Sequence, residues 1–68
     1  MNDVRWVKPD GSPISCTEKL KVLRQNLEEL RQIAQDAFED ALLMECHEEQ
    51  IRAVFREVID SLENPYQP

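Results

Sequence analysis

The chain has 68 residues, a formal net charge of −6 and 41% hydrophobic residues, and these values exclude several classes of protein. A chain of this length forms one domain at most, and it buries only about 60% of the surface that its unfolded form exposes. No stretch approaches the roughly 20 apolar residues of a membrane span, and the N-terminus lacks the apolar core of a secretory signal, so we expect a cytoplasmic protein.

Residues 1–14 lack a helical pattern and are predicted to form an extended N-terminal arm or a short irregular hairpin. Asp10 and Gly11 are the turn signal within it. Pro13 weakens the hairpin interpretation, because proline cannot donate a hydrogen bond to a strand ladder. Trp6 is the only tryptophan. We interpret it either as an anchor that holds the arm against the helices or as a hot spot for a partner.

A long first helix is predicted over about residues 16–44. Ser15 and Glu18 have the spacing of a capping box, which places the helix start at Cys16, within two residues. The apolar residues of the helix then recur at alternating spacings of three and four, as the a and d positions of a heptad do. They are Leu20, Leu23, Leu27, Leu30, Ala34, Ala37, Ala41 and Met44. Ile33, Phe38 and Leu42 widen this face, which indicates contact with more than one neighbour.

A second helix is predicted over about residues 47–63. A polar run over residues 45–50 interrupts the apolar face for a full turn, and helices longer than 25 residues are uncommon in small domains, so we place a break between Glu45 and His47. A single rod over 16–63 is the alternative, because the heptad register continues beyond the polar run. Asn64 and Pro65 end the second helix. Residues 65–68 are then a loose tail.

These elements predict an all-α fold, an antiparallel helical hairpin over residues 15–64 with a long first helix and a shorter second helix. Both apolar faces are wider than one contact requires, so we expect a homodimer that forms a four-helix bundle. If the arm with Trp6 covered the exposed half of the first helix, the protein would instead be a monomer. The expected interface consists of Leu23, Leu27, Leu30, Ala34, Ala37, Phe38 and Ala41.

Charge is distributed unevenly along the chain. Residues 15–31 sum to +1, whereas residues 32–51 contain six acidic residues and neither lysine nor arginine, so this stretch alone contributes −6. A general DNA-binding protein needs clustered cations, so DNA is not expected as a partner. Asp36, Glu39 and Asp40 share one helical face, and with Trp6 they are the predicted docking residues for a basic protein partner.

The sequence has no constellation of residues that predicts catalysis, and we expect a protein that is not an enzyme and needs no cofactor. His47 has no serine to activate, and adjacent residues on a helix point about 100° apart, which separates His47 from Cys46. Thiolate, imidazole and carboxylate groups are all metal ligands, so Cys46 and His47 are candidate metal ligands. One loop supplies too few donors for a complete site. Cys16 and Cys46 lie roughly 45 Å apart along the predicted helix, so free thiols are expected.

Three functions follow from these residues. The first is a non-catalytic protein-protein interaction module, an adaptor or assembly factor. The second is a metal- or thiol-dependent sensor built on Cys46 and His47. The third is RNA binding: a short dimerising helical hairpin resembles, in layout alone, the small plasmid copy-number RNA-binding hairpins. That resemblance implies RNA contact through the basic residues of the first helix, which are Lys19, Lys21, Arg24 and Arg31.

Overall fold

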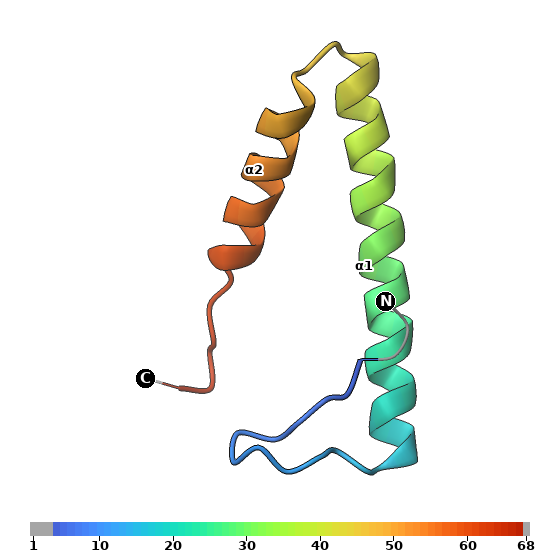
Figure 1. Ribbon diagram of the computed structural model, residues 1–68, viewed down its shortest axis with the longest axis vertical. Coiled ribbons are helices and arrows are strands. Elements are labelled where there is room, and N and C mark those ends of the chain that lie inside the picture. The colour runs from blue at the N-terminus through green and yellow to red at the C-terminus, as the bar shows by residue number, and fades with distance from the viewer. Residues whose placement is uncertain (1–3, 68) are drawn as a thin grey trace. The chain divides into compact units, whose positions relative to one another are not determined.

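The computed structural model describes residues 4–67 and contains two helices, α1 over Thr17–Leu43 and α2 over Glu48–Asp60 (Figure 1). No strand occurs within residues 4–67. The prediction of an all-α hairpin with a long first and a shorter second helix is confirmed. The chain divides into two compact units, Met1–Ile33 and Ala34–Pro68. Residues 1–3 of the predicted arm and residue 68 of the predicted tail lie outside the described residues.

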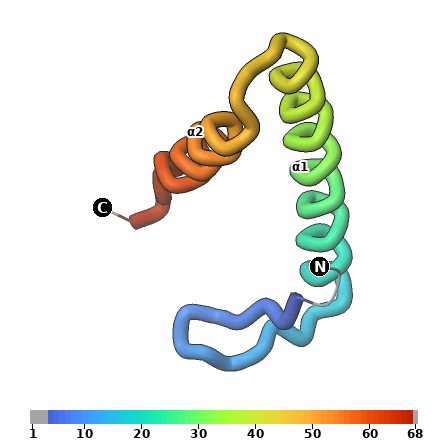
Figure 2. Tube along the Cα trace, turned by 45° about the horizontal axis from the view of Figure 1, so that its top comes forward, coloured from blue at the N-terminus to red at the C-terminus, as the bar shows by residue number. Residues whose placement is uncertain are grey.

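The N-terminal arm is an irregular hairpin that turns back on itself between Lys8 and Ser12 (Figure 2). The Gly11 amide donates to the Lys8 carbonyl over 2.8 Å, and the Lys8 amide donates to the Ser12 carbonyl over 2.8 Å. Gly11 has a φ of 89°, which fits the left-handed residue that completes a three-residue hairpin loop. Pro13 is tolerated because it pairs with Val7 at a bridge whose neighbouring hydrogen bond, from Ile14 to Trp6, does not use the proline nitrogen.

The side chain of Asp10 closes this loop. Its Oδ1 accepts hydrogen bonds from the Ser12 amide at 2.9 Å and from the Ser12 hydroxyl at 2.6 Å. These bonds to the Ser12 hydroxyl and amide stabilise the carboxylate and hold the pKa of Asp10 below its ordinary value. The turn predicted at Asp10 and Gly11 is therefore present in the folded arm.

Helix α1 begins at Thr17, so Cys16 and not Ser15 occupies the capping position. The Cys16 carbonyl accepts the first helical hydrogen bond, from the Leu20 amide at 3.0 Å. The amide of Lys19, the third residue of the helix, lowers the pKa of the Cys16 thiol. The helix start thus lies within two residues of Cys16, as expected, but the capping box built on Ser15 is one residue out of register.

Helix α1 ends in a turn that contains no glycine. The Cys46 amide donates to the Ala41 carbonyl and the Glu45 amide donates to the Leu42 carbonyl, each over 3.0 Å. This is the pair of hydrogen bonds of a Schellman motif, which requires a left-handed residue where glycine is preferred. Glu45 holds that position with a φ of 65°. The break between Glu45 and His47 therefore exists and is made by a strained glutamate.

Helix α2 begins at a histidine cap. His47 has an extended backbone, and its Nδ1 accepts a hydrogen bond from the Glu49 amide at 3.2 Å. At the other end, the Ser61 hydroxyl donates to the Val58 carbonyl at 2.8 Å, so the helix stops at Asp60, before the predicted end near residue 63. Local side-chain hydrogen bonds thus define both ends of α2.

Within the unit Ala34–Pro68, α2 packs back against the C-terminal part of α1. Ile51 is 5% exposed and is the only buried residue among residues 4–67. The rings of Phe38 and Phe55 meet edge to face with centroids 6.5 Å apart. These contacts form the small core of the hairpin. Neither α1 nor α2 combines the length and the apolar character needed to cross a membrane, and residues 4–67 contain no other helix.

Candidate functional site

The two apolar columns of the α1 heptad differ in burial. The a column is half-buried at all four positions, which are Leu20, Leu27, Ala34 and Ala41. The d column is largely open: Leu23 is half-buried, Ala37 is exposed, and Leu30 and Met44 are 48% and 76% exposed. The neighbouring Ile33 is 69% exposed. The protein's own contacts therefore cover one side of the predicted seam and leave the other side available.

Of the seven residues predicted to form an interface, five are half-buried and two are exposed. Ala34, Phe38 and Ala41 lie in the unit that contains α2, and Phe38 contacts Phe55 of that helix. Leu30 and Ala37 are exposed, while Leu23 and Leu27 are half-buried. Phe38 is thus used within the chain, whereas Leu30 and Ala37 present their surface outward.

The unit Met1–Ile33 has an open apolar groove beside the start of α1. Ile14, Val22 and Leu23 supply its apolar surface, and Glu18 and Lys19 line it as well. Trp6 and Ile14 are half-buried, and Val22 is 52% exposed. Trp6 is therefore not a fully exposed docking residue.

Helix α2 carries a second open apolar surface. Val54, Val58 and Ile59 are between 46% and 55% exposed, and Leu62, just beyond the helix, is 71% exposed, although Ile51 and Phe55 on the same helix pack inward. Sequence reasoning identified the apolar face of α2 but left these residues out of the expected interface. The signal was the width of the face, which exceeds what one neighbouring helix covers.

The predicted acidic docking residues, Asp36, Glu39 and Asp40, are all exposed on α1. Glu39 Oε2 accepts a hydrogen bond from Gln35 Nε2 at 3.1 Å, one helical turn away. In the same unit, Glu48 pairs with Arg52 through an Nε to Oε2 distance of 3.2 Å. The acidic side chains of this unit are therefore exposed to solvent, and Glu48 is paired with a cation.

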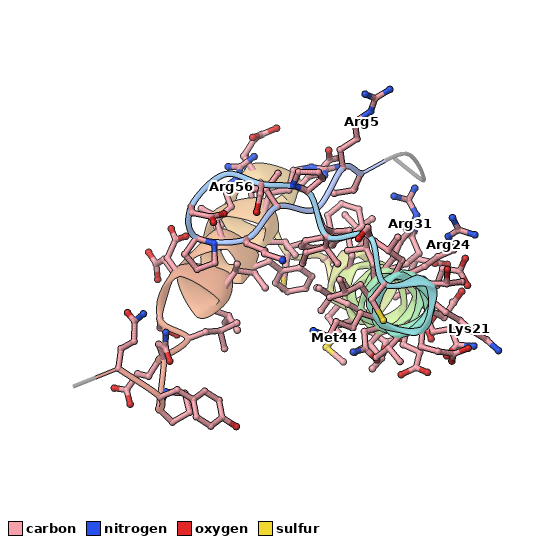
Figure 3. All side chains as sticks on the ribbon, turned by 90° about the horizontal axis from the view of Figure 1, so that it is seen from below. Arg5, Lys21, Arg24, Arg31, Met44 and Arg56 are labelled. Atoms are coloured by element: carbon pink, nitrogen blue, oxygen red, sulfur yellow. The ribbon has the colours of Figure 1, made fainter. Side chains whose placement is uncertain are left out.

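The basic residues of α1 lie in the other unit. Lys19, Lys21, Arg24 and Arg31 are all exposed, and Figure 3 shows the side chains of Lys21, Arg24 and Arg31 projecting outward from the helix. The helix thus carries all its lysine and arginine residues in its N-terminal part, whereas Asp36, Glu39 and Asp40 lie in its C-terminal part.

The two candidate metal ligands, Cys46 and His47, are exposed and lie in the turn between the helices. Among residues 4–67, no three side chains of the metal-binding types histidine, cysteine, aspartate and glutamate gather in one place. The Nδ1 atom of His47 is occupied by the Glu49 amide. The geometry therefore assigns His47 a capping role, which sequence reasoning missed because histidine is an uncommon capping residue.

Both cysteines are free and exposed. At Cys16 the amide of Lys19 lowers the pKa of the thiol from its ordinary value, and the amide of Glu18 and the charge of Lys19 act in the same direction. This is the expected effect of a helix N-terminus on a thiolate. The cause is local to the cap, so it describes the stability of the helix start.

No protein-family model matches the sequence, and neither a curated protein nor a solved structure matches the chain.

Proposed function

We propose that the protein is a non-catalytic interaction module, an adaptor or assembly factor whose helices bind another protein chain through their uncovered apolar faces. One observation supports this proposal above all others: within residues 4–67 only Ile51 is buried, while thirteen large hydrophobic residues are at least 40% exposed. Among them, Val54 and Val58 lie one turn apart on α2, and adjoining apolar side chains that are open to solvent mark an interaction site. A second copy of the chain is the first partner that we expect, in a four-helix bundle.

A small core supports the same proposal on energetic grounds. Folded domains are stable by only about 5–15 kcal/mol, and chains of fewer than about 80 residues usually need a disulfide, a metal or association with another chain. The two cysteines are free, and the described residues hold no cluster of metal ligands. Association therefore supplies the missing burial, and exposed residues such as Val58 and Ile59 become part of a shared core.

Photo-crosslinking in cells that express the full chain tests the proposal. A photoreactive amino acid replaces Val58, which is 55% exposed on the apolar face of α2. The control replaces Arg56, which lies about 160° away around the same helix. We expect a discrete covalent product with a protein at position 58 and none at position 56. If position 58 gives no product with any protein, including a second copy, the proposal is wrong.

The acidic surface defines a second class of partner for the same module, a protein with a basic surface. Six acidic residues and no lysine or arginine lie within residues 32–51, so a basic partner gains favourable charge contacts there. Such binding weakens with added salt, because contacts between exposed charges are screened. A variant that carries Asp36→Asn, Glu39→Gln and Asp40→Asn is expected to lose this salt dependence. Unchanged binding by the variant would exclude the acidic residues as the contact.

A further inference from the structure

The uncovered side of α1 carries charges of opposite sign at its two ends. Because α1 is one helix from Thr17 to Leu43, residues at spacings of three, four and seven share a face. We define the α1 stripe by the seven such residues, which are Lys19, Leu23, Asn26, Leu30, Ile33, Ala37 and Asp40. All are exposed except Leu23, which is half-buried. Along the stripe a cation comes first, then a centre that is apolar except for the amide of Asn26, and then an anion.

When two copies of α1 lie side by side in opposite directions, the cationic end of each stripe lies beside the anionic end of the other. If a twofold axis passes through Leu30, Leu30 of one copy meets Leu30 of the other. Seven residues to either side, Leu23 lies opposite Ala37 of the second copy, a large side chain against a small one. Near the ends, Lys19 comes within one residue of the position opposite Asp40. An isologous interface requires this kind of self-complementarity, whereas an unrelated partner does not.

The parallel alternative is unfavourable for the same residues. Two parallel helices related by a twofold axis along their length place Lys19 beside Lys19 and Asp40 beside Asp40. Like charges at the edge of a helix pair oppose association and select against that orientation. Packing at the apolar centre is no better in the parallel pair, because Ala37 then faces Ala37 and leaves space that Leu23 fills in the antiparallel pair.

We propose that α1 pairs with α1 of a second copy in an antiparallel orientation, through the α1 stripe, with Lys19 of each chain beside Asp40 of the other. This inference rests on the proposed function and specifies its first partner and geometry. The a column and Phe38 stay within their own chain, and the d column forms the contact between chains. Phe38 lies about 80–100° around α1 from Leu30 and Ala37, so the contact between Phe38 and Phe55 keeps α2 of each chain beside the α1 stripe, next to the shared core of a four-helix bundle.

Charge reversal tests the orientation in the full chain. Lys19→Glu or Asp40→Lys alone turns two symmetric attractions into repulsions, and we expect the dimer dissociation constant to rise about tenfold. The double variant, Lys19→Glu with Asp40→Lys, restores both pairs and is expected to return the constant close to that of the wild type. Lys21→Glu is the matched control, because Lys21 lies on another side of α1, and it is expected to leave dimerisation unchanged.

Disulfide formation provides an independent readout. In chains with Cys16→Ser and Cys46→Ser, one population carries Leu23→Cys and another carries Ala37→Cys. The antiparallel pair predicts a mixed disulfide between the two populations, whereas a parallel pair predicts only disulfides within each population. A wild-type dimer with unaffected charge variants or without the mixed disulfide overturns the antiparallel pairing and leaves the interaction module standing. A chain that stays monomeric overturns the pairing as well. In that case the presence or absence of a crosslinked product at position 58 decides whether the proposed function is correct.

Discussion

The guanidinium carbon of Arg52 lies 4.6 Å from the centre of the Phe38 ring, and this contact joins the two helices of the hairpin. Arg52 also forms an ion pair with Glu48. Its side chain therefore contacts a carboxylate on α2 and the Phe38 ring on α1. Arginine stacks on aromatic rings because its guanidinium is planar and weakly hydrated. The edge-to-face contact of Phe38 with Phe55 completes the cluster. The orientation of α2 on this part of α1 is therefore supported by ring contacts as well as by Ile51.

Removing the Arg52 guanidinium should weaken the hairpin. We expect Arg52→Gln to lower the free energy of unfolding by about 0.5–1.5 kcal/mol. The substitution removes a half-exposed cation-π contact with Phe38 and the ion pair with Glu48, which lies one helical turn away. Urea unfolding at a fixed protein concentration measures the change. Arg56→Gln is the control, since the described residues provide Arg56 with neither contact. Equal effects of the two variants would mean that the ring contact does not stabilise the fold.

The strained turn residue gives a prediction of opposite sign. Glu45→Gly should raise the free energy of unfolding by about 0.5–1 kcal/mol, because glycine adopts the left-handed conformation without the steric cost that a side chain incurs. Glu49→Gly, which removes the same side chain within the first turn of α2, should instead lower it by about 1 kcal/mol. Thermal unfolding followed by circular dichroism distinguishes the two. A destabilised Glu45→Gly variant would contradict the assigned turn.

The cap of α2 predicts a specific order among His47 variants. His47→Ala removes the acceptor for the Glu49 amide and should cost about 1 kcal/mol, whereas His47→Asn keeps an acceptor of a preferred type and should be at least as stable as the wild type. The matched comparison is Cys46→Ala, whose side chain caps nothing in the described residues and whose effect should be small. If the His47→Asn and His47→Ala variants were equally stable, His47 would not act as the cap of α2.

The cap of α1 predicts a pH dependence. The pKa of the Cys16 thiol is lowered from its ordinary value of 9.0, so the folded state favours the thiolate. This contribution to stability is fully present above the ordinary pKa and is lost as pH falls through the lowered pKa. In a Cys46→Ser background, the difference in unfolding free energy from the further variant Cys16→Ser should therefore grow in favour of cysteine as pH rises. The rate of alkylation of Cys16 should reach half its maximum below pH 9.0. A difference that is flat with pH would contradict a lowered pKa of Cys16 in the folded state.

Periodicity predicted the two helices and the apolar faces, because burial favours side chains at fixed helical spacings. It did not predict which local groups would end them. A helix stop without glycine depends on Glu45 adopting an unfavourable backbone conformation, and only the hydrogen bonds to Ala41 and Leu42 reveal it. His47 caps α2 although histidine is not among the residue types that are commonest there.

The division of the heptad face also required the structure. The a and d columns are equivalent as a sequence pattern, and their burial differs because each helix finds a neighbour on one side only. Ala37, in the expected interface, is exposed, whereas Phe38 beside it contacts α2. Which column is left for a second chain is thus a property of tertiary packing, and residue spacing does not contain it.

Sedimentation equilibrium of the full chain over a range of concentrations tests most directly the claim that two copies complete each other's core. We expect a mass twice that of one chain, which falls toward the single-chain mass on dilution. We also expect the unfolding free energy to rise with protein concentration, because only the dimer buries the open side of α1. A single-chain mass at every concentration, with stability that does not depend on concentration, would contradict the claim.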